Sequence, residues 1–286
     1  MLNLILGTAN FSSNYGVIEK KVESFDLEKL VNFAQENGIN HFDTAKAYKG
    51  VEVKLGKYLD KSYSIEVDSK ISSKDCKSPG SIVVAVEESI HNIGIRNLST
   101  LYLHQHDLLA GNDSKVVITG LEKVLELGLA NYLGASVYTQ EDLLLCKKIF
   151  PSLTRFQILE NICDRRLINS PEMMKISESG NQINVRSIFL QGLLLSKPID
   201  IPSNLEGARN ALNKLNMYSR NHKIPKLYLC IAYAKSIKWA KKIVIGVDSL
   251  DQLREILSSR YELPKDWELE VPILPRDLID PRFWLK

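Results

Sequence analysis

Residues 27–43, Leu-Glu-Lys-Leu-Val-Asn-Phe-Ala-Gln-Glu-Asn-Gly-Ile-Asn-His-Phe-Asp, carry the pattern that decides the fold. The apolar residues of the first half recur at the spacing of an amphipathic helix, at Leu27, Leu30, Val31 and Ala34. Asn37 and Gly38 tolerate a positive φ, so they predict the end of this helix. Residues 39–43 then form a short predicted strand.

The same alternation extends in both directions from this stretch. Leu2–Leu6 is a strand-like apolar run that ends at Gly7, so residues 2–43 predict a strand, a helix and a second strand, which is a βαβ unit. Further strands are predicted at 64–70, 99–104, 131–136, 156–161, 183–190 and 242–246. Further helix faces are predicted within 82–93, 117–125, 228–234 and 250–257.

A regular succession of strands and helices requires a parallel sheet, and closing eight such units gives an α/β fold of the (β/α)8 TIM barrel type. Because no Pro/Ser-rich linker divides the chain, we expect a single domain over 1–286, with 258–286 as a C-terminal tail. The alternative is an open doubly wound sheet, which normally places a G-x-G-x-x-G turn after its first strand. Residues 7–11 read Gly-Thr-Ala-Asn-Phe instead, which favours the barrel.

The composition excludes several classes of protein. With 286 residues, 44% of them hydrophobic and 25% charged, the chain is typical of a globular protein. The net charge of +3 is spread without a dense basic block, so we expect neither a nucleic acid nor a membrane partner. The four cysteines contain no CxxC pair, so we expect reduced thiols, no metal site and no disulfide framework.

The N-terminal residues show neither the positive leader nor the small-residue cleavage pattern of a signal peptide. No segment reaches the roughly 18 uninterrupted apolar residues of a membrane span. We therefore expect a cytoplasmic protein. Its oligomeric state stays open between a monomer and a weak dimer.

Four titratable residues follow neighbouring predicted strands. Asp43 and Tyr48 follow the second strand, Lys70 the third and His104 the fourth. In a parallel barrel the carboxyl ends of the strands meet at one mouth, so these side chains are expected to converge. Taken singly, each has a structural explanation as a turn cap, a loop aromatic, a solvated lysine or a buried histidine.

Together the four residues suit the protonation of a carbonyl oxygen as a hydride arrives. A tyrosine with a pKa of about 10 is a weak acid, and a nearby lysine ammonium is expected to lower that pKa. Asp43 would keep Lys70 charged and oriented, and His104 would hydrogen-bond the oxygen on which negative charge develops.

The motifs that follow in order along the chain resemble those of the aldo-keto reductase superfamily. They are Gly-Thr-Ala-Asn-Phe at 7–11, Asn-Tyr-Gly at 14–16, the segment 37–48, 50–56, Ser-Lys-Ile at 69–71, Leu-Tyr-Leu-His-Gln-His-Asp at 101–107, 133–136, 156–161, 189–194 and 245–255. The resemblance implies that Asp43, Tyr48, Lys70 and His104 are the catalytic residues. His41 and His106 are expected to be structural.

The resemblance also implies an NADP cofactor, with NAD as the alternative. Gly7 and Thr8 belong to the first motif, Ser136 and Gln157 match the residues that hold the nicotinamide carboxamide, and the backbone of Phe189, Gln191 and Gly192 would follow the pyrophosphate. Which residue stacks on the nicotinamide stays open between Ile188 and Phe189. The adenosine end would be held by Gly246, Asp248, Gln252 and Glu255.

Two features of this last region bear on the cofactor, the first from the residues themselves and the second from the resemblance. Ser249 and Gln252 have the spacing of a capping box, so a helix N-terminus with free N–H groups is expected there, a ready anion site. Asp248 stands where relatives have a serine that touches the 2′-phosphate, and a carboxylate would repel phosphate but accept hydrogen bonds from a 2′-hydroxyl. Lys197 or Arg209 could still supply a positive charge.

The sequence thus predicts an NAD(P)H-dependent oxidoreductase that reduces an aldehyde or ketone, a small-molecule carbonyl substrate, to an alcohol with Tyr48 as the proton donor. The C-terminal Pro-Arg-Phe-Trp is similar to reductases of sugar-like carbonyl compounds. One alternative is a cofactor-binding sensor or regulatory subunit with little turnover. A second is an aldolase barrel in which Lys70 forms a Schiff base. The tail aromatics are expected to pack on the barrel rather than line the site: Tyr261, Trp267, Phe283 and Trp284.

Overall fold

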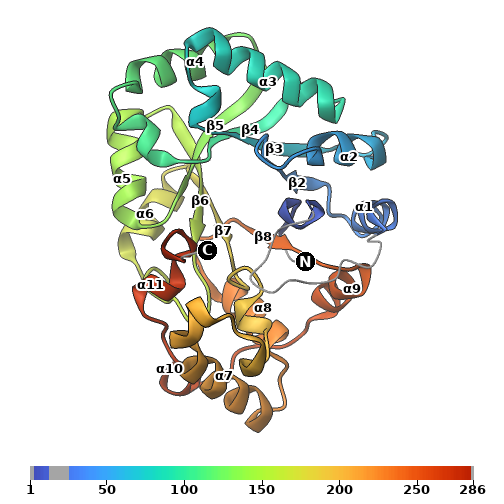
Figure 1. Ribbon diagram of the computed structural model, residues 1–286, viewed down its shortest axis with the longest axis vertical. Helices are drawn as coiled ribbons and strands as arrows, with labels where there is room; N and C mark the ends of the chain where they lie inside the picture. Colours follow the sequence, from blue (N-terminus) through green and yellow to red (C-terminus); the bar gives the residue numbers. More distant parts are fainter. Residues whose placement is uncertain (1–2, 13–25, 285–286) are drawn as a thin grey trace.

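The computed structural model describes residues 3–12 and 26–284 and shows a closed barrel of eight parallel strands (Figure 1). Each strand pairs with the next in the chain, and the last strand pairs with the first. Their bounds are β1 Leu4–Gly7, β2 His41–Asp43, β3 Glu66–Ile71, β4 Leu98–Leu103, β5 Ala130–Val137, β6 Leu153–Leu159, β7 Gln182–Arg186 and β8 Lys242–Gly246. The predicted (β/α)8 barrel is confirmed, and the open-sheet alternative is wrong because β1 has a neighbour on both sides.

Helices surround the strands in Figure 1. Their bounds are α1 Leu27–Glu36, α2 Val51–Tyr58, α3 Pro79–Ile93, α4 Ser114–Glu126, α5 Gln140–Ile149, α6 Pro171–Glu178, α7 Arg209–Asn221, α8 Lys226–Ser236, α9 Leu250–Ser258, α10 Trp267–Glu270 and α11 Arg276–Ile279. Several begin at a side chain that caps the first free amides, as Ser78 does for α3 and Thr139 for α5. The apolar patterns predicted α1, α3, α4, α8 and α9, but not α2, α5, α6 and α7.

Several predicted strands differ in their bounds from the observed ones; β6, for example, spans Leu153–Leu159 instead of 156–161. β2 begins at His41 instead of residue 39, and β7 ends at Arg186 instead of Leu190. Beyond Arg186 the chain leaves the sheet because Ser187 and Leu190 adopt positive φ angles of 61° and 47°. Leu2, predicted to start the first strand, and the motif at 14–16 lie outside the described residues.

The barrel interior is polar on two adjacent strands. Successive side chains of a strand point to opposite faces, so His41 and Asp43 share one face of β2, and Asp68 and Lys70 share one face of β3. They meet inside the barrel, where Lys70 pairs with Asp43 and His41 pairs with Asp68. The fully buried Tyr102 on β4 lies opposite Gly134, where an added Cβ atom would come within 2.6 Å of the Tyr102 ring.

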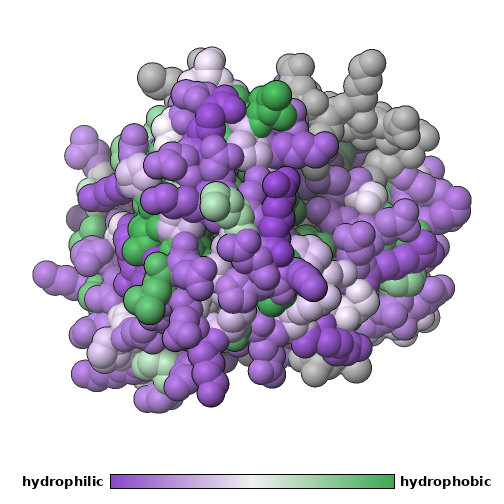
Figure 2. Space-filling view, turned by 90° about the horizontal axis from the view of Figure 1, so that it is seen from below, coloured by the Kyte–Doolittle hydropathy of each residue, from purple (hydrophilic) through white to green (hydrophobic). Residues whose placement is uncertain are grey.

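The apolar core lies between the strands and the surrounding helices, where Leu, Ile and Val side chains such as Leu30, Ile82 and Val117 are fully buried. The face in Figure 2 is largely hydrophilic, with hydrophobic residues scattered in small groups. All four cysteines are buried and free, and within the described ranges none of the helices combines the length and apolar character that a bilayer crossing requires.

The segment after α9 packs against the barrel. The buried Trp267 meets the Tyr233 ring edge-on at 5.4 Å, and Tyr261 stacks on Tyr228 at 4.9 Å. The amide of Leu274 donates to the carbonyl of Cys163, which ties the segment to the loop after β6. These contacts give Trp267 and Tyr261 the packing role that the sequence predicted.

Candidate active site

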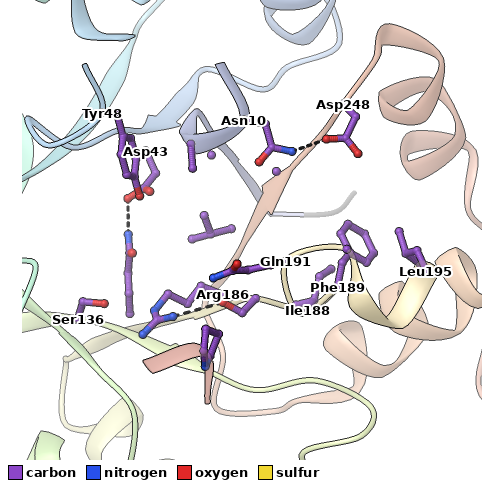
Figure 3. Close-up of a pocket in the computed structure, with 18 of the residues that line it drawn as sticks. Asn10, Asp43, Tyr48, Ser136, Arg186, Ile188, Phe189, Gln191, Leu195 and Asp248 are labelled. Carbon is purple, nitrogen blue, oxygen red and sulfur yellow. Dashed lines mark hydrogen bonds between the residues drawn. The ribbon is translucent and has the colours of Figure 1, made fainter. Parts of the chain in front are cut away.

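A cavity of about 460 Å³ opens at the carboxyl end of the strands. Of the site residues predicted from the sequence, all but Thr8 and Glu255 line it: Gly7, Asp43, Tyr48, Lys70, His104, Ser136, Gln157, Phe189, Gln191, Gly192, Gly246, Asp248 and Gln252. Figure 3 shows Asp43, Tyr48 and Ser136 on one side, called the Tyr48 side below. Leu195 and Asp248 lie on the opposite side, called the Asp248 side.

A buried ion pair forms the floor of the Tyr48 side. Lys70 Nζ donates to both carboxylate oxygens of Asp43 at 2.6 Å and to the carbonyl of Thr44 at 2.9 Å. Gln157 Nε2 donates to Asp43 Oδ1 at 2.5 Å. Because an ammonium has three hydrogens, these contacts use the whole donor capacity of Lys70.

Tyr48 and His104 stand above this pair. Both side chains are half-buried, and their rings meet edge-on with centroids 6.2 Å apart. The carbonyl of Tyr48 accepts from the amide of Val51, the first residue of α2, so the tyrosine is fixed at the start of a helix. A phenol and an imidazole therefore face the same cavity, close to the ion pair.

The electrostatics of these two groups differ from the prediction. Burial raises the pKa of Tyr48 above its ordinary value, and the Asp43 carboxylate raises it further. The prediction that Lys70 lowers this pKa is wrong, because burial and the Asp43 carboxylate outweigh any nearby cation; the cation that lowers the Tyr48 pKa is Arg186. Burial, followed by Lys70 and Arg186, lowers the pKa of His104 to about 4, so its imidazole is neutral at pH 7.

Arg186 is a residue of this cavity that the sequence analysis missed. It is the last residue of β7, and the strand was predicted to run on to Leu190. A strand end placed correctly at residue 186 would have identified it, because side chains at the carboxyl ends of barrel strands face the mouth. Ile188, one of the two candidates for stacking on the nicotinamide, also lines the cavity. Lining residues not assigned a role from the sequence are Ala9, Asn10, Tyr138, Ser187, Leu195, Ser196, Val244 and Pro281.

The loop after β7 wraps one wall of the cavity in an uncommon conformation. Ser187, Leu190 and Gln191 have positive φ angles of 61°, 47° and 53°, and Gly192 follows at 87°. Non-glycine residues in this region are strained by about 1 kcal/mol or more each, and such strain gathers at functional sites. An added Cβ at Gly192 would meet nothing within 4 Å, so the backbone here borders open space.

The Asp248 side is built from β1, β8 and the start of α9. Asn10 Nδ2 donates to Asp248 Oδ1 at 2.7 Å, as Figure 3 shows. Ser249 caps α9 by accepting from the amide of Gln252. The predicted capping box is only half correct, because Gln252 Oε1 accepts from the amide of Asp248 instead of that of Ser249.

Four residues considered for the cofactor lie elsewhere. Thr8 is buried, and its hydroxyl donates to the carbonyl of Asp43 at 3.0 Å, so it joins β1 to β2 beneath the cavity wall. Glu255 is exposed on α9. Lys197 is exposed outside the cavity lining, and Arg209 pairs with Glu206 on the surface.

A smaller hollow of about 320 Å³ lies at the opposite end of the barrel. Here His41 Nε2 contacts Asp68 at 2.8 Å, and His41 Nδ1 contacts Glu66 at 2.9 Å. Burial by itself lowers the pKa of His41, but the two acids outweigh it and raise this pKa to about 9. His106 Nε2 lies 3.2 Å from a carboxylate oxygen of Asp142, so both histidines contact carboxylates.

Comparisons with known proteins agree with this arrangement. The family model described as "Aldo/keto reductase family" matches residues 3–267. Among solved structures, the chain is similar to a thermostable aldo-keto reductase in complex with the inhibitor epalrestat, with a TM-score of 0.68 and 17% identity over 94% of this chain and 93% of that one. At that identity the likeness shows the fold alone. A search of curated proteins found no match.

Proposed function

Because the chain belongs to the aldo/keto reductase family, an oxidoreductase family, we propose that it uses NADPH or NADH to reduce an aldehyde or ketone, with Tyr48 as the proton donor. The observation that carries this proposal is the convergence of Tyr48, His104 and the Asp43–Lys70 pair on one cavity.

The cavity has the features that a dinucleotide requires. Ser136 and Gln157 offer polar groups for the carboxamide on the Tyr48 side. The backbone at Gly192 borders open space, and the first turn of α9 presents amides that suit an anionic group. When bound, the dihydronicotinamide supplies the hydride, and the protein supplies orientation and the proton.

The proton comes from Tyr48 in this proposal. Its raised pKa keeps the phenol protonated at neutral pH, so the hydroxyl can donate to the carbonyl oxygen as negative charge develops there. The neutral His104 donates a second hydrogen bond to that oxygen. Lys70 and Asp43 do not contact the substrate oxygen in this proposal; their ion pair forms the floor of the cavity beneath Tyr48 and His104.

The aldolase alternative receives no support from the geometry. A Schiff base requires a neutral, accessible amine, whereas Lys70 is 4% exposed and its hydrogens are donated to Asp43 and Thr44. The neighbouring carboxylate stabilises the charged ammonium, which cannot attack a carbonyl.

The choice between NADPH and NADH depends on the Asp248 side in this proposal. A carboxylate at position 248 repels a 2′-phosphate and accepts from a 2′-hydroxyl. Fluorescence titration of the protein with each cofactor measures the ratio of the two dissociation constants. Asp248→Ser is expected to shift that ratio about tenfold towards NADPH, as the loss of one repulsive contact would. An unchanged ratio would remove Asp248 from cofactor selection.

The reductase is tested by mixing the protein with each cofactor and a panel of aldehydes, ketones and open-chain sugars. We expect cofactor oxidation in equal amount to alcohol formed. Tight cofactor binding with no turnover on any compound would support the sensor or regulatory subunit instead. The panel therefore separates the two functions by a single readout, the nicotinamide absorbance.

A further inference from the structure

Arg186 is a charged side chain of the cavity to which the proposed reaction gives no role. It lies at the carboxyl end of β7 and lines the same cavity as Tyr48 and His104. In Figure 3 its side chain extends towards Ser136, on the Tyr48 side, and away from Leu195 and Asp248. Its guanidinium therefore faces the place where the carbonyl would react.

The hydrogen bonds of Arg186 are few and long for a half-buried guanidinium. Nη1 lies 3.3 Å from Ser187 Oγ and Nη2 lies 3.2 Å from the carbonyl of Val137. Nε is buried and has no partner, although a guanidinium carries five N–H donors. One face lies 4.6 Å from the Tyr138 ring, and since two of the five N–H groups have an acceptor, three are left without one among the described residues.

The charge on Arg186 is also uncompensated. Over residues 3–12 and 26–284, its contacts are with neutral groups, and no carboxylate there forms an ion pair with it. Asp43 is neutralised by Lys70, and Asp248 lies on the other side of the cavity beside Asn10. A bound anion would satisfy the N–H groups that Arg186 leaves unpaired.

We propose that Arg186 binds a carboxylate of the substrate, so that the substrates are aldehydes or ketones that carry a carboxylate close to the carbonyl. The planar edge of a guanidinium matches a carboxylate with two parallel hydrogen bonds. One uncompensated positive charge balances one carboxylate, whereas a phosphate monoester would bring about 1.5 to 2 negative charges. This inference rests on the proposed reductase function and names its substrate class.

The test compares two matched aldehydes, butanal and its ω-carboxylate analogue succinic semialdehyde. We expect the wild-type kcat/KM for the carboxylate compound to exceed that for butanal by about 10- to 100-fold, as one charge-assisted pair allows. Arg186→Met should abolish this preference, chiefly through KM for the carboxylate compound. Arg186→Lys, which keeps the charge but not the planar edge, should retain part of it.

Arg155→Met is the matched control. Arg155 lines the hollow at the opposite end of the barrel, where its guanidinium lies over the Tyr132 ring. This variant also loses one barrel arginine, so it reports general effects of that change. The ratio of the two kcat/KM values should stay at the wild-type value in Arg155→Met.

Three results would overturn the inference. The first is a wild-type enzyme that reduces butanal as well as the carboxylate compound. The second is an equal loss on both aldehydes in Arg186→Met, which would mean that Arg186 acts on Tyr48 alone. The third is a loss of NADPH affinity in Arg186→Met, which would assign the guanidinium to the cofactor.

Failure of the proposed function has a different signature, since the wild-type protein would then reduce no compound of the panel. Calorimetric titration with butyrate, a monocarboxylate of the same chain length, still decides the inference in that case. Binding to the wild-type protein and to Arg155→Met, but not to Arg186→Met, would support a carboxylate site at Arg186. Absence of binding to the wild-type protein would contradict it.

Discussion

Strands β2 and β3 are joined by two pairs of an acidic and a basic side chain, one nearer each end of the barrel. The two pairs differ in their surroundings. Towards the carboxyl end the acid is Asp43 on β2 and the base is Lys70 on β3. Towards the amino end the order is reversed, with His41 on β2 and Asp68 on β3. Each strand thus carries one acidic and one basic side chain, two positions apart, and the two pairs lie in different environments.

The difference lies in what surrounds each pair. At the amino end Glu66 contacts both His41 and Lys242, so the charged groups there are joined to one another. At the carboxyl end Tyr48, His104 and Arg186 face a cavity and form no ion pair with a carboxylate in the described chain. We therefore take the His41–Asp68 pair, whose charged neighbours are paired with one another, as structural. We take the Asp43–Lys70 pair, which lies beside hydrogen-bond donors that face a cavity, as part of the proposed active site.

The largest expected effect separates the two ends by activity. Tyr48→Phe removes the proposed proton donor and should slow carbonyl reduction by roughly two to four decades with little change in cofactor affinity. His41→Gln, at the amino end, should leave the rate within a few-fold of wild type. The single-turnover rate of cofactor oxidation measures both. Similar rates for Tyr48→Phe and wild type would remove Tyr48 from the mechanism.

The next effect concerns the buried pair itself. Lys70→Met leaves the Asp43 carboxylate buried without its cation, so the free energy of unfolding should fall by about 3–5 kcal/mol. The double variant Asp43→Asn with Lys70→Met should recover part of this loss, because no uncompensated charge remains. Urea unfolding gives all three values. A Lys70→Met variant as stable as wild type would mean that the pair contributes nothing to stability.

His41 should make stability depend on pH. Its folded pKa of about 9 exceeds the unfolded value of about 6.5, so its stabilisation is complete below pH 6.5 and is lost as the pH rises to 9. The loss should be on the order of 2 kcal/mol. His41→Gln should abolish that part of the pH dependence of urea unfolding. An identical slope in the variant and the wild type would contradict the assignment.

His104 should give the smallest effect, with the opposite sign. Its folded pKa of about 4 lies below the unfolded value of about 6.5, so the unfolded chain binds the extra proton between these values. Stability is therefore lost as the pH falls from 6.5 to 4, and His104→Gln should lose less of it. Thermal unfolding across that window provides the measurement. A steeper loss in the variant than in wild type would show that His104 is not held neutral.

The sequence predicted the barrel because its strands and several of its helices have continuous apolar patterns. No such signal marks α2, a short helix that contains Gly56. An added Cβ at Gly56 would collide with the carbonyl oxygens of Asn92 and Ile93, so the glycine permits close packing of α2 on α3. This reason depends on a contact with a distant segment, which local patterns do not contain.

The four predicted catalytic residues converge in the structure because each follows a strand whose end was placed within a residue or two. Arg186 was missed because the apolar run 188–190 resembles a continued strand, whereas Ser187 and Leu190 take positive φ without the glycine or asparagine that marks such turns. The Tyr48 pKa was predicted in the wrong direction because the burial of a phenol and the neutralisation of Lys70 depend on tertiary contacts.

The most direct measurement is a crystal structure of the protein grown with oxidised cofactor, NADP in one crystal and NAD in another. The account predicts the nicotinamide ring on the Tyr48 side, within reach of Tyr48 and His104, and the adenosine on the Asp248 side. Electron density for the dinucleotide at the amino end of the barrel, or with its nicotinamide turned away from Tyr48, would contradict the account.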